Sequence, residues 1–378
     1  MRGLMTSGRL LSVTVLRLRA LAVAVIAFAV FASAASAATV ALPGGVATAV
    51  REYGGTIVFS EWAQAERRWY LSVREVGAEQ RRLAVAPSAV PFDADIGTDS
   101  AGRPQLIYQR CAGTAGAPVG CDLFVFSLAA ATGERPVRNA NDPGRNDVGP
   151  TLWRGRIAWT REYGTGKDAN PVVYTKLLTA PRSLPSTRLP GVPTTRCAEE
   201  VGLVEPPCGA TTNRGVEALE LWGDNLGLIV RYVFEGLPGI SQTELRLNRV
   251  SDRSAQQIAF LASGLNGQSF VGPSFFSGRL AWYRACAVTE ASCNTFVGPW
   301  RYRISTRRYE QGAPGPVLVS GFADTGTRLY EVVSCPDVSI TAVPAPPPAP
   351  ACAITSVAPP AYAPVAAPDL ASSQPPGR

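Results

Sequence analysis

The chain has 378 residues, of which 46% are hydrophobic, enough apolar material for a large folded core. It contains no histidine, which excludes Ser-His-Asp and Cys-His nucleophilic sites, histidine-ligated zinc and imidazole proton shuttles. The formal charge of +7 falls to 32 − 29 = +3 without the four arginines of residues 1–37, too weak to indicate a nucleic-acid or membrane-surface partner.

Residues 1–37 have the features of a secretory signal peptide. Arginines precede the uninterrupted apolar run 20–32, and Ala35-Ser36-Ala37 supplies the small-x-small site that signal peptidase requires. The run is too short for a membrane-spanning helix, which needs about 20 residues. No cysteine lies at the cleavage point, which argues against a lipoprotein. We therefore expect a secreted or extracytoplasmic protein with no membrane span after signal cleavage.

One stretch of sequence occurs twice. Residues 148–161 and 271–284 both follow the pattern V-G-P-[ST]-x-x-x-G-R-[IL]-A-W-x-R. Each copy reads as a short strand, a tight turn at Gly155 or Gly278, and a second strand rich in β-forming residues. The repetition indicates an all-β repeat protein.

Aligned on this turn, the chain divides into six units. The turn positions are Gly55, Gly102, Gly155, Asp224, Gly278 and Gly326. Third strands are predicted at residues 69–76, 122–128, 172–178, 244–250, 301–306 and 353–357. Fourth strands are predicted at residues 82–86, 135–138, 257–261 and 317–320.

Four antiparallel strands in about 50 residues are typical of a β-propeller blade. The sixth unit lacks a fourth strand of its own, and the segment 39–42 has no other evident role. We therefore predict a six-bladed propeller over residues 38–357 that is closed by the N-terminal strand, with seven blades as the alternative. Residues 358–378 are rich in Pro and Ala and are expected to be disordered.

All eight cysteines lie in the mature chain, in close sequential pairs: Cys111/Cys121, Cys197/Cys208, Cys286/Cys293 and Cys335/Cys352. An even number behind a signal peptide indicates disulfides. Three of the pairs flank the loop between the second and third strands of a unit, where each bridge would contribute about 2–4 kcal/mol. The pair Cys197/Cys208 would bridge a Pro-rich insertion before the fourth unit.

In a propeller, the loops between second and third strands lie on the same face as the loops between blades. We call this the loop face and expect ligands there. Its polar candidates are Asp95, Asp147, Arg161, Glu162 and Arg284. Arg161 and Arg284 occupy equivalent repeat positions, so pairing between blades is the alternative for them.

No residue is assigned a catalytic role, although Asp147 and Glu162 would suit glycoside chemistry if they formed a carboxylate pair. The repeated Trp159 and Trp282 are expected in the core, with sugar stacking as the alternative.

The repeat resembles that of TolB-like propellers, a group of secreted bacterial β-propellers. The resemblance rests on G-R-[IL]-A-W-x-R, a loop, and then Cys121-Asp122-Leu123-Phe124-Val125-Phe126-Ser127-Leu128 followed by Thr132-Gly133. It covers about residues 39–357, but most units lack the S-P-D-G turn of that repeat. The resemblance implies a six-bladed propeller that binds proteins or small ligands through one face.

The sequence thus predicts a secreted, non-enzymatic binding or scaffold propeller. We expect a monomer without cofactor or metal, whose partner is an unknown protein or a cell-envelope carbohydrate. The alternative is a carboxylate-based carbohydrate-active enzyme, a glycoside hydrolase or lyase. A third possibility is a structural envelope protein whose Pro/Ala tail threads the cell wall.

Overall fold

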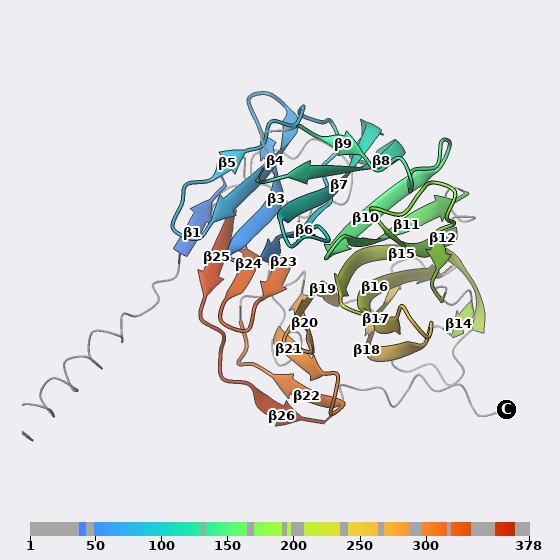
Figure 1. Ribbon diagram of the computed structural model, residues 1–378. Helices are drawn as coiled ribbons and strands as arrows, with labels where there is room; N and C mark the ends of the chain where they lie inside the picture. Colours follow the sequence, from blue (N-terminus) through green and yellow to red (C-terminus); the bar gives the residue numbers. More distant parts are fainter. Residues whose placement is uncertain are drawn as a thin grey trace, which may run out of the picture. The chain divides into compact units, whose positions relative to one another are not determined.

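The structure is a computed structural model that describes residues 38–42, 49–129, 133–164, 170–190, 195–197, 208–234, 241–263, 268–286, 297–315, 319–333 and 352–366. These residues form strands and turns but no helix. The strands make six sheets arranged as blades around an axis (Figure 1). The predicted six-bladed, all-β architecture is therefore confirmed. The expected signal peptide lies outside the described residues.

The first three blades each contain four antiparallel strands, given from the axis outward. Blade I contains β2 (Arg51–Tyr53), β3 (Thr56–Ala63), β4 (Arg68–Glu75) and β5 (Arg81–Arg82). Blade II contains β6 (Ala94–Thr98), β7 (Pro104–Thr114), β8 (Ala117–Ser127) and β9 (Arg135–Pro136). Blade III contains β10 (Asn146–Trp153), β11 (Arg156–Tyr163), β12 (Asn170–Leu177) and β13 (Thr187–Arg188).

The other three blades carry additions or a strand from the far end of the chain. Blade IV contains β15 (Cys208–Trp222), β16 (Asn225–Phe234), β17 (Ser241–Arg249) and β18 (Ala255–Ser263), with β14 (Thr195–Cys197) paired to the start of β15. Blade V contains β19 (Gln268–Phe276), β20 (Arg279–Cys286), β21 (Gly298–Arg303), β22 (Arg308–Gln311) and β26 (Ala363–Val365). Blade VI contains β23 (Val319–Asp324), β24 (Leu329–Val333), β25 (Ala353–Val357) and β1 (Ala38–Ala41).

The N-terminal strand closes the ring. β1 lies beside β25 as the outermost strand of blade VI (Figure 1), and Leu42 N donates a hydrogen bond to Cys352 O over 3.1 Å. The innermost strands β2, β6, β10, β15, β19 and β23 each contact the next around the axis, and β23 contacts β2. The propeller is built by the unit Thr39–Arg378, which begins inside β1. The predicted closure is therefore correct, and the seven-bladed alternative is wrong.

The hydrophobic core consists of six clusters, one between each pair of adjacent blades. The cluster between blades I and II, for example, includes Val58 and Leu71 from one sheet and Ile96 and Leu106 from the other. The cluster that contains Val40 and Ile57 joins blade VI to blade I. Because neighbouring blades cover both faces of each sheet, a second strand such as β3 is buried along almost its whole length.

Two predictions near the C-terminus need correction. The fourth strand of blade V is β22, whereas Val319 and Ser320 of the predicted strand 317–320 begin β23, the innermost strand of blade VI. Disorder from residue 358 onward is also wrong for its first part, because β26 pairs with β22. An edge strand needs backbone hydrogen bonds on one side only, so it tolerates proline, and Pro364 lies opposite Glu310.

The repeated V-G-P stretch forms a β-bulge in the innermost strand of blades III and V. In blade III, Val148 pairs with Thr160 and Thr151 with Ala158, so Gly149 and Pro150 share the position opposite Trp159. Gly149 has a φ of +58°, a conformation that favours glycine. The same two-for-one register occurs opposite Trp282. Both tryptophans are fully buried, as predicted.

A hydroxyl group in the bulge joins adjacent blades by hydrogen bonds. Thr151 Oγ1 donates to Asp95 Oδ2 of blade II over 2.7 Å and accepts from Leu221 N of blade IV over 2.9 Å. The equivalent Ser274 Oγ accepts from Asp324 N of blade VI over 2.8 Å. The Ser or Thr that the two repeat copies share at this position therefore joins neighbouring innermost strands.

We predict that Gly97→Ala destabilises the ring. A Cβ on Gly97 would lie 2.2 Å from Leu152 O in the next innermost strand. Because this oxygen belongs to the backbone, it cannot move away without shifting the strand. The free energy of unfolding should fall by about 1–3 kcal/mol, measured by chemical denaturation. Gly116→Ala, whose Cβ would meet nothing within 4 Å, is the control and should change stability little. Equal stability of the two variants would contradict the predicted close approach.

Candidate ligand-binding site

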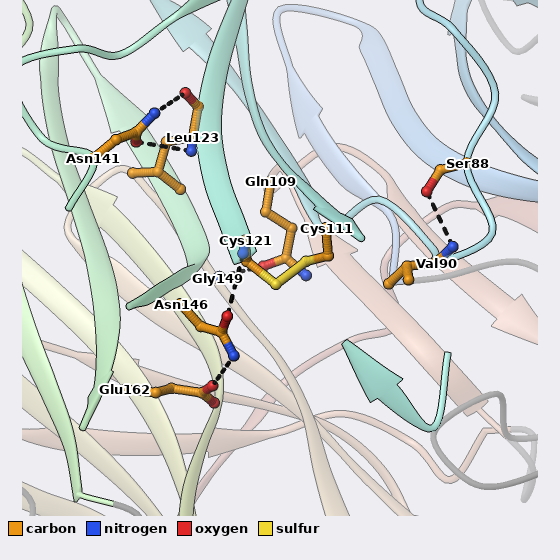
Figure 2. Close-up of a disulfide and its surroundings, with 10 residues drawn as sticks. All are labelled: Ser88, Val90, Gln109, Cys111, Cys121, Leu123, Asn141, Asn146, Gly149 and Glu162. Carbon is orange, nitrogen blue, oxygen red and sulfur yellow. Dashed lines mark hydrogen bonds between the residues drawn. A yellow bond between two sulfur atoms is a disulfide. The ribbon is translucent and has the colours of Figure 1, made fainter. Parts of the chain in front are cut away.

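One of the four predicted disulfides, Cys111–Cys121, is confirmed, and the other three pairings stay predictions. Cys111 on β7 and Cys121 on β8 are bonded and bridge the loop between the second and third strands of blade II (Figure 2). Cys352 is also disulfide-bonded, and Cys197 lies directly opposite Cys208 in the β14–β15 ladder. Cys293 and Cys335 lie outside the described residues. Disulfides of this kind are typical of proteins outside the cytoplasm.

Two of the loop-face candidates form a buried ion pair. Asp147 is completely buried on β10 and accepts hydrogen bonds from Trp159 Nε1 and Arg161 Nε, each over 2.8 Å. Arg161 also contacts Asp142 at 3.2 Å. Burial raises the pKa of Asp147, whereas Arg161 opposes that rise. The pair connects strands within blade III, so both residues support the fold.

Glu162 does not join Asp147 as a carboxylate pair. Asp147 is opposite Arg161 in the β10–β11 ladder and Asn146 is opposite Glu162, so the two carboxylates point to opposite faces of the sheet. Asn146 Nδ2 donates to Glu162 Oε2 over 3.1 Å, and Asn146 Oδ1 accepts from Cys121 N (Figure 2). This chain of contacts ties the disulfide-bridged strand to blade III.

The other two candidates are not brought together with these. Asp95 is buried on β6, where it accepts from Thr151 Oγ1 and Leu152 N of blade III, each over 2.7 Å. Arg284 is half-buried on β20, opposite Phe270 and Gly298. Asp95, Asp147, Arg161 and Glu162 are therefore engaged in contacts between strands.

A pocket lined by aromatic side chains lies on the opposite face, at the axis. We call this the turn face, because it carries the turns between the first and second strands of each blade. The axial pocket has a volume of about 430 Å³. Its aromatic lining residues are Tyr53, Trp153, Trp222, Phe275, Phe276 and Tyr330. Its polar lining side chains are Glu52, Thr325, Thr327 and Arg328.

Strand position explains why these aromatic residues meet. Tyr53, Trp153, Trp222 and Phe276 each end an innermost strand, directly before its turn. The ring centres of Trp153 and Trp222 are 5.6 Å apart, and those of Tyr53 and Trp153 are 6.2 Å apart. Blade II ends its innermost strand in Thr98, which leaves room for contact between blades I and III.

The sequence contains a signal for this site, although the loop-face prediction did not use it. An aromatic residue stands immediately before the turn in four of the six units: Tyr53-Gly54, Trp153-Arg154-Gly155, Trp222-Gly223 and Phe276-Ser277-Gly278. Residues at equivalent blade positions lie around the same ring, so a recurring aromatic at the end of the first strand predicts a cluster at the axis.

Two residues earlier in the same strands, polar side chains form a layer below the aromatic one. Because strand side chains alternate, Arg51, Thr151 and Glu220 point the same way as the aromatic residues two positions later. Arg51 of blade I reaches across the axis to blade IV. It donates to Leu219 O over 3.4 Å, and its Nε lies 3.6 Å from Glu220 Oε2. We call this polar layer the floor; it lies beneath the aromatic residues, and neither Arg51 nor Glu220 lines the axial pocket itself.

Carboxyl groups outnumber the single guanidinium in this floor. Burial and the neighbouring Asp95 raise the pKa of Glu220 well above its ordinary value, while Arg51 opposes the rise. Burial also raises the pKa of Asp95 and of Glu52. Glu220 Oε2 and Arg51 Nη1 have no hydrogen-bond partner within the described residues.

The axial pocket suits a neutral or polar ligand with flat apolar faces. Aromatic rings pack against such faces, while Thr325, Thr327 and Arg328 on the same wall offer hydroxyl and guanidinium groups for hydrogen bonds. The described residues contain no group of three or more His, Cys, Asp or Glu side chains that could hold a metal. They also contain no helix long and apolar enough to cross a membrane.

No protein-family model and no curated protein matches the chain. Similar solved structures include TolB from Acinetobacter baumannii, at 12% identity and a TM-score of 0.42, covering 84% of this chain and 67% of that one. An α-L-arabinanase from Penicillium chrysogenum, solved with arabinobiose, gives 8% identity, a TM-score of 0.47, and coverages of 85% and 97%. A prolyl endopeptidase gives 16% identity and a TM-score of 0.44, and this chain covers 41% of the length of that protein.

These likenesses concern the fold alone. The strand topology independently gives six blades closed by the N-terminal strand. At the level of fold the protein is therefore a six-bladed β-propeller, as the repeat motif predicted.

We predict that Glu220→Gln stabilises the protein at pH 8 but not at pH 4. Above the ordinary pKa of 4.5, the unfolded state releases this proton while the native state retains it, so stability falls as pH rises toward the raised native pKa. Glutamine removes that cost because it has no proton to release. Thermal unfolding at both pH values measures the effect.

Glu75→Gln is the control, because the Glu75 side chain is 59% exposed. It should change the melting temperature equally little at both pH values. A Glu220→Gln variant that is destabilised at pH 8, or unaffected by pH, would contradict the account of the floor.

Proposed function

We propose that the protein is a secreted carbohydrate-binding propeller that holds a saccharide in the axial pocket without turning it over. The observation that carries the proposal is the convergence of six aromatic side chains from five blades around one cavity of about 430 Å³. A sugar ring offers C–H faces for the aromatic rings and hydroxyls for the polar groups beside them. A bound sugar therefore contacts both the aromatic and the polar side chains that line the pocket.

Secretion is supported by two independent features. Residues 1–37 have the composition of a signal peptide, and the Cys111–Cys121 disulfide suits an oxidising compartment. Outside the cytoplasm, the protein would meet saccharides of the cell envelope or its surroundings. The protein acts as a monomer in this proposal and needs no cofactor.

Binding is favoured over hydrolysis by the placement of carboxylates. Two carboxyl groups about 5–9.5 Å apart must flank the bond in most glycoside hydrolases. Asp147 and Glu162 point to opposite sheet faces, and Glu52 is the one carboxylate that lines the axial pocket within the described residues. Glu52 Oε1 accepts from Gly55 N over 2.6 Å, which gives it a structural role in the turn.

We predict that Trp222→Ala and Trp153→Ala each weaken saccharide binding about tenfold, the equivalent of one lost aromatic stacking contact. Isothermal titration calorimetry of the mature protein against neutral glucan, xylan, arabinan and galactan oligosaccharides provides the measurement. Trp222→Phe, which keeps an aromatic face, should retain most of the affinity. Thermal unfolding checks that each variant is folded.

Tyr70→Ala is the matched control, because Tyr70 is an aromatic residue of the outer part of blade I and does not line the pocket. Its affinity should equal that of the wild type. Binding unaffected by both tryptophan variants would refute the axial site. Release of reducing ends by the wild type would refute the non-enzymatic part of the proposal.

A further inference from the structure

A second cavity lies on the turn face between blades II and III. It has a volume of about 600 Å³ and is bounded by the blade II turn at residues 99–103, the segment 135–139 and the blade III turn at residues 178–180. We call it the inter-blade cavity. None of its lining residues lines the axial pocket.

The lining carries a surplus of positive charge. Arg103, Arg135 and Arg138 line the cavity with Asp99, which gives three positive charges against one negative. Asp99 forms an ion pair with Arg103, whose Nη2 lies 2.6 Å from Asp99 Oδ2. Arg135 and Arg138 are exposed, and neither has an ion-pair partner in the part of the chain that the structure describes. Two guanidinium groups are therefore available to an anion.

The same cavity contains a buried acceptor that lacks a donor. Gln105 is 6% exposed, and its Oε1 has no hydrogen-bond partner within the described residues. An unpaired buried carbonyl is costly, and a ligand hydroxyl would satisfy it. A ligand that fits must combine an anionic group with hydroxyl donors.

The walls of the inter-blade cavity are held by internal hydrogen bonds. Asn139 Nδ2 donates to Ala180 O over 2.8 Å and to Leu178 O over 3.2 Å. Lys176 Nζ donates to Asn139 O over 3.0 Å, and Gly155 N donates to Thr98 O over 2.7 Å. Blades II and III are thereby locked together around the cavity, which lowers the ordering cost of binding.

One turn connects this cavity to the axial pocket. Trp153 lines the axial pocket and Gly155 lines the inter-blade cavity, and two residues of chain span no more than about 7 Å. Between them, the guanidinium of Arg154 lies 5.5 Å from the centre of the Trp153 ring. The two cavities are therefore neighbours on the turn face, separated by the turn at Arg154.

We propose that the inter-blade cavity binds the anionic group of an acidic saccharide, a uronate carboxylate or a sulfate ester, whose neighbouring unit stacks in the axial pocket. The guanidinium groups of Arg135 and Arg138 hold the anion, and Gln105 Oε1 accepts from a hydroxyl. This assignment rests on the proposed saccharide binding at the axis and names its substrate class.

The experiment compares ligands that differ only in charge. Calorimetry measures the affinity of oligogalacturonate and of its methyl ester, and of sulfated and unsulfated galactan oligosaccharides. The wild type should bind the charged member of at least one pair about tenfold more tightly. The double variant Arg135→Ala/Arg138→Ala should lose that preference while its affinity for the neutral member stays unchanged. The pair that shows the preference identifies the anion as carboxylate or sulfate.

The control removes the same charge elsewhere. Arg68→Ala/Arg308→Ala takes two arginines from exposed positions on blades I and V and should keep the preference for the charged ligand. A preference that survives Arg135→Ala/Arg138→Ala, or is lost equally in the control, overturns the inter-blade site. If Trp222→Ala still weakens neutral binding about tenfold in that case, the axial proposal stands. If no oligosaccharide of any charge binds, the axial proposal itself has failed.

Discussion

Closure of the ring around one axis is the constraint on which the rest of the structure depends. β1 supplies the missing outer strand of blade VI, so the first strand of the chain completes the last blade and the six innermost strands meet. Once they meet, residues at the same strand position lie at the same height around the axis. A feature that looks trivial within one repeat, such as an aromatic residue before a turn, becomes a cluster when four repeats share it.

The axis is organised as two layers with different physical roles. The aromatic layer is half-buried and open to ligand, whereas the polar layer below it is closed by Arg51, Glu220 and the Thr151–Asp95 hydrogen bond. Buried carboxyl groups with raised pKa values cost stability, whereas the Thr151–Asp95 and Arg51–Glu220 contacts join strands of different blades. The floor therefore links blades I to IV beneath the aromatic rings.

The sequence predicted the architecture well because repetition, turn chemistry and cysteine spacing are local. The V-G-P repeat, the closing strand and the Cys111–Cys121 bridge all followed from such patterns. The site could not be found in the same way. Asp147 and Glu162 looked like loop carboxylates, but their neighbours across the ladder, Arg161 and Asn146, show their structural roles. Pro364 reads as a disorder signal, yet the free edge of β22 accommodates it.

The central claim is that ligands bind at the turn face of the axis and not at the disulfide-bridged loop face. A crystal structure of the mature protein with the tightest-binding oligosaccharide tests this most directly. The account predicts a sugar ring packed on Trp153 and Trp222, with the saccharide chain extending toward Gly155. A saccharide seated instead among the loops near Cys111 and Glu162 would contradict it.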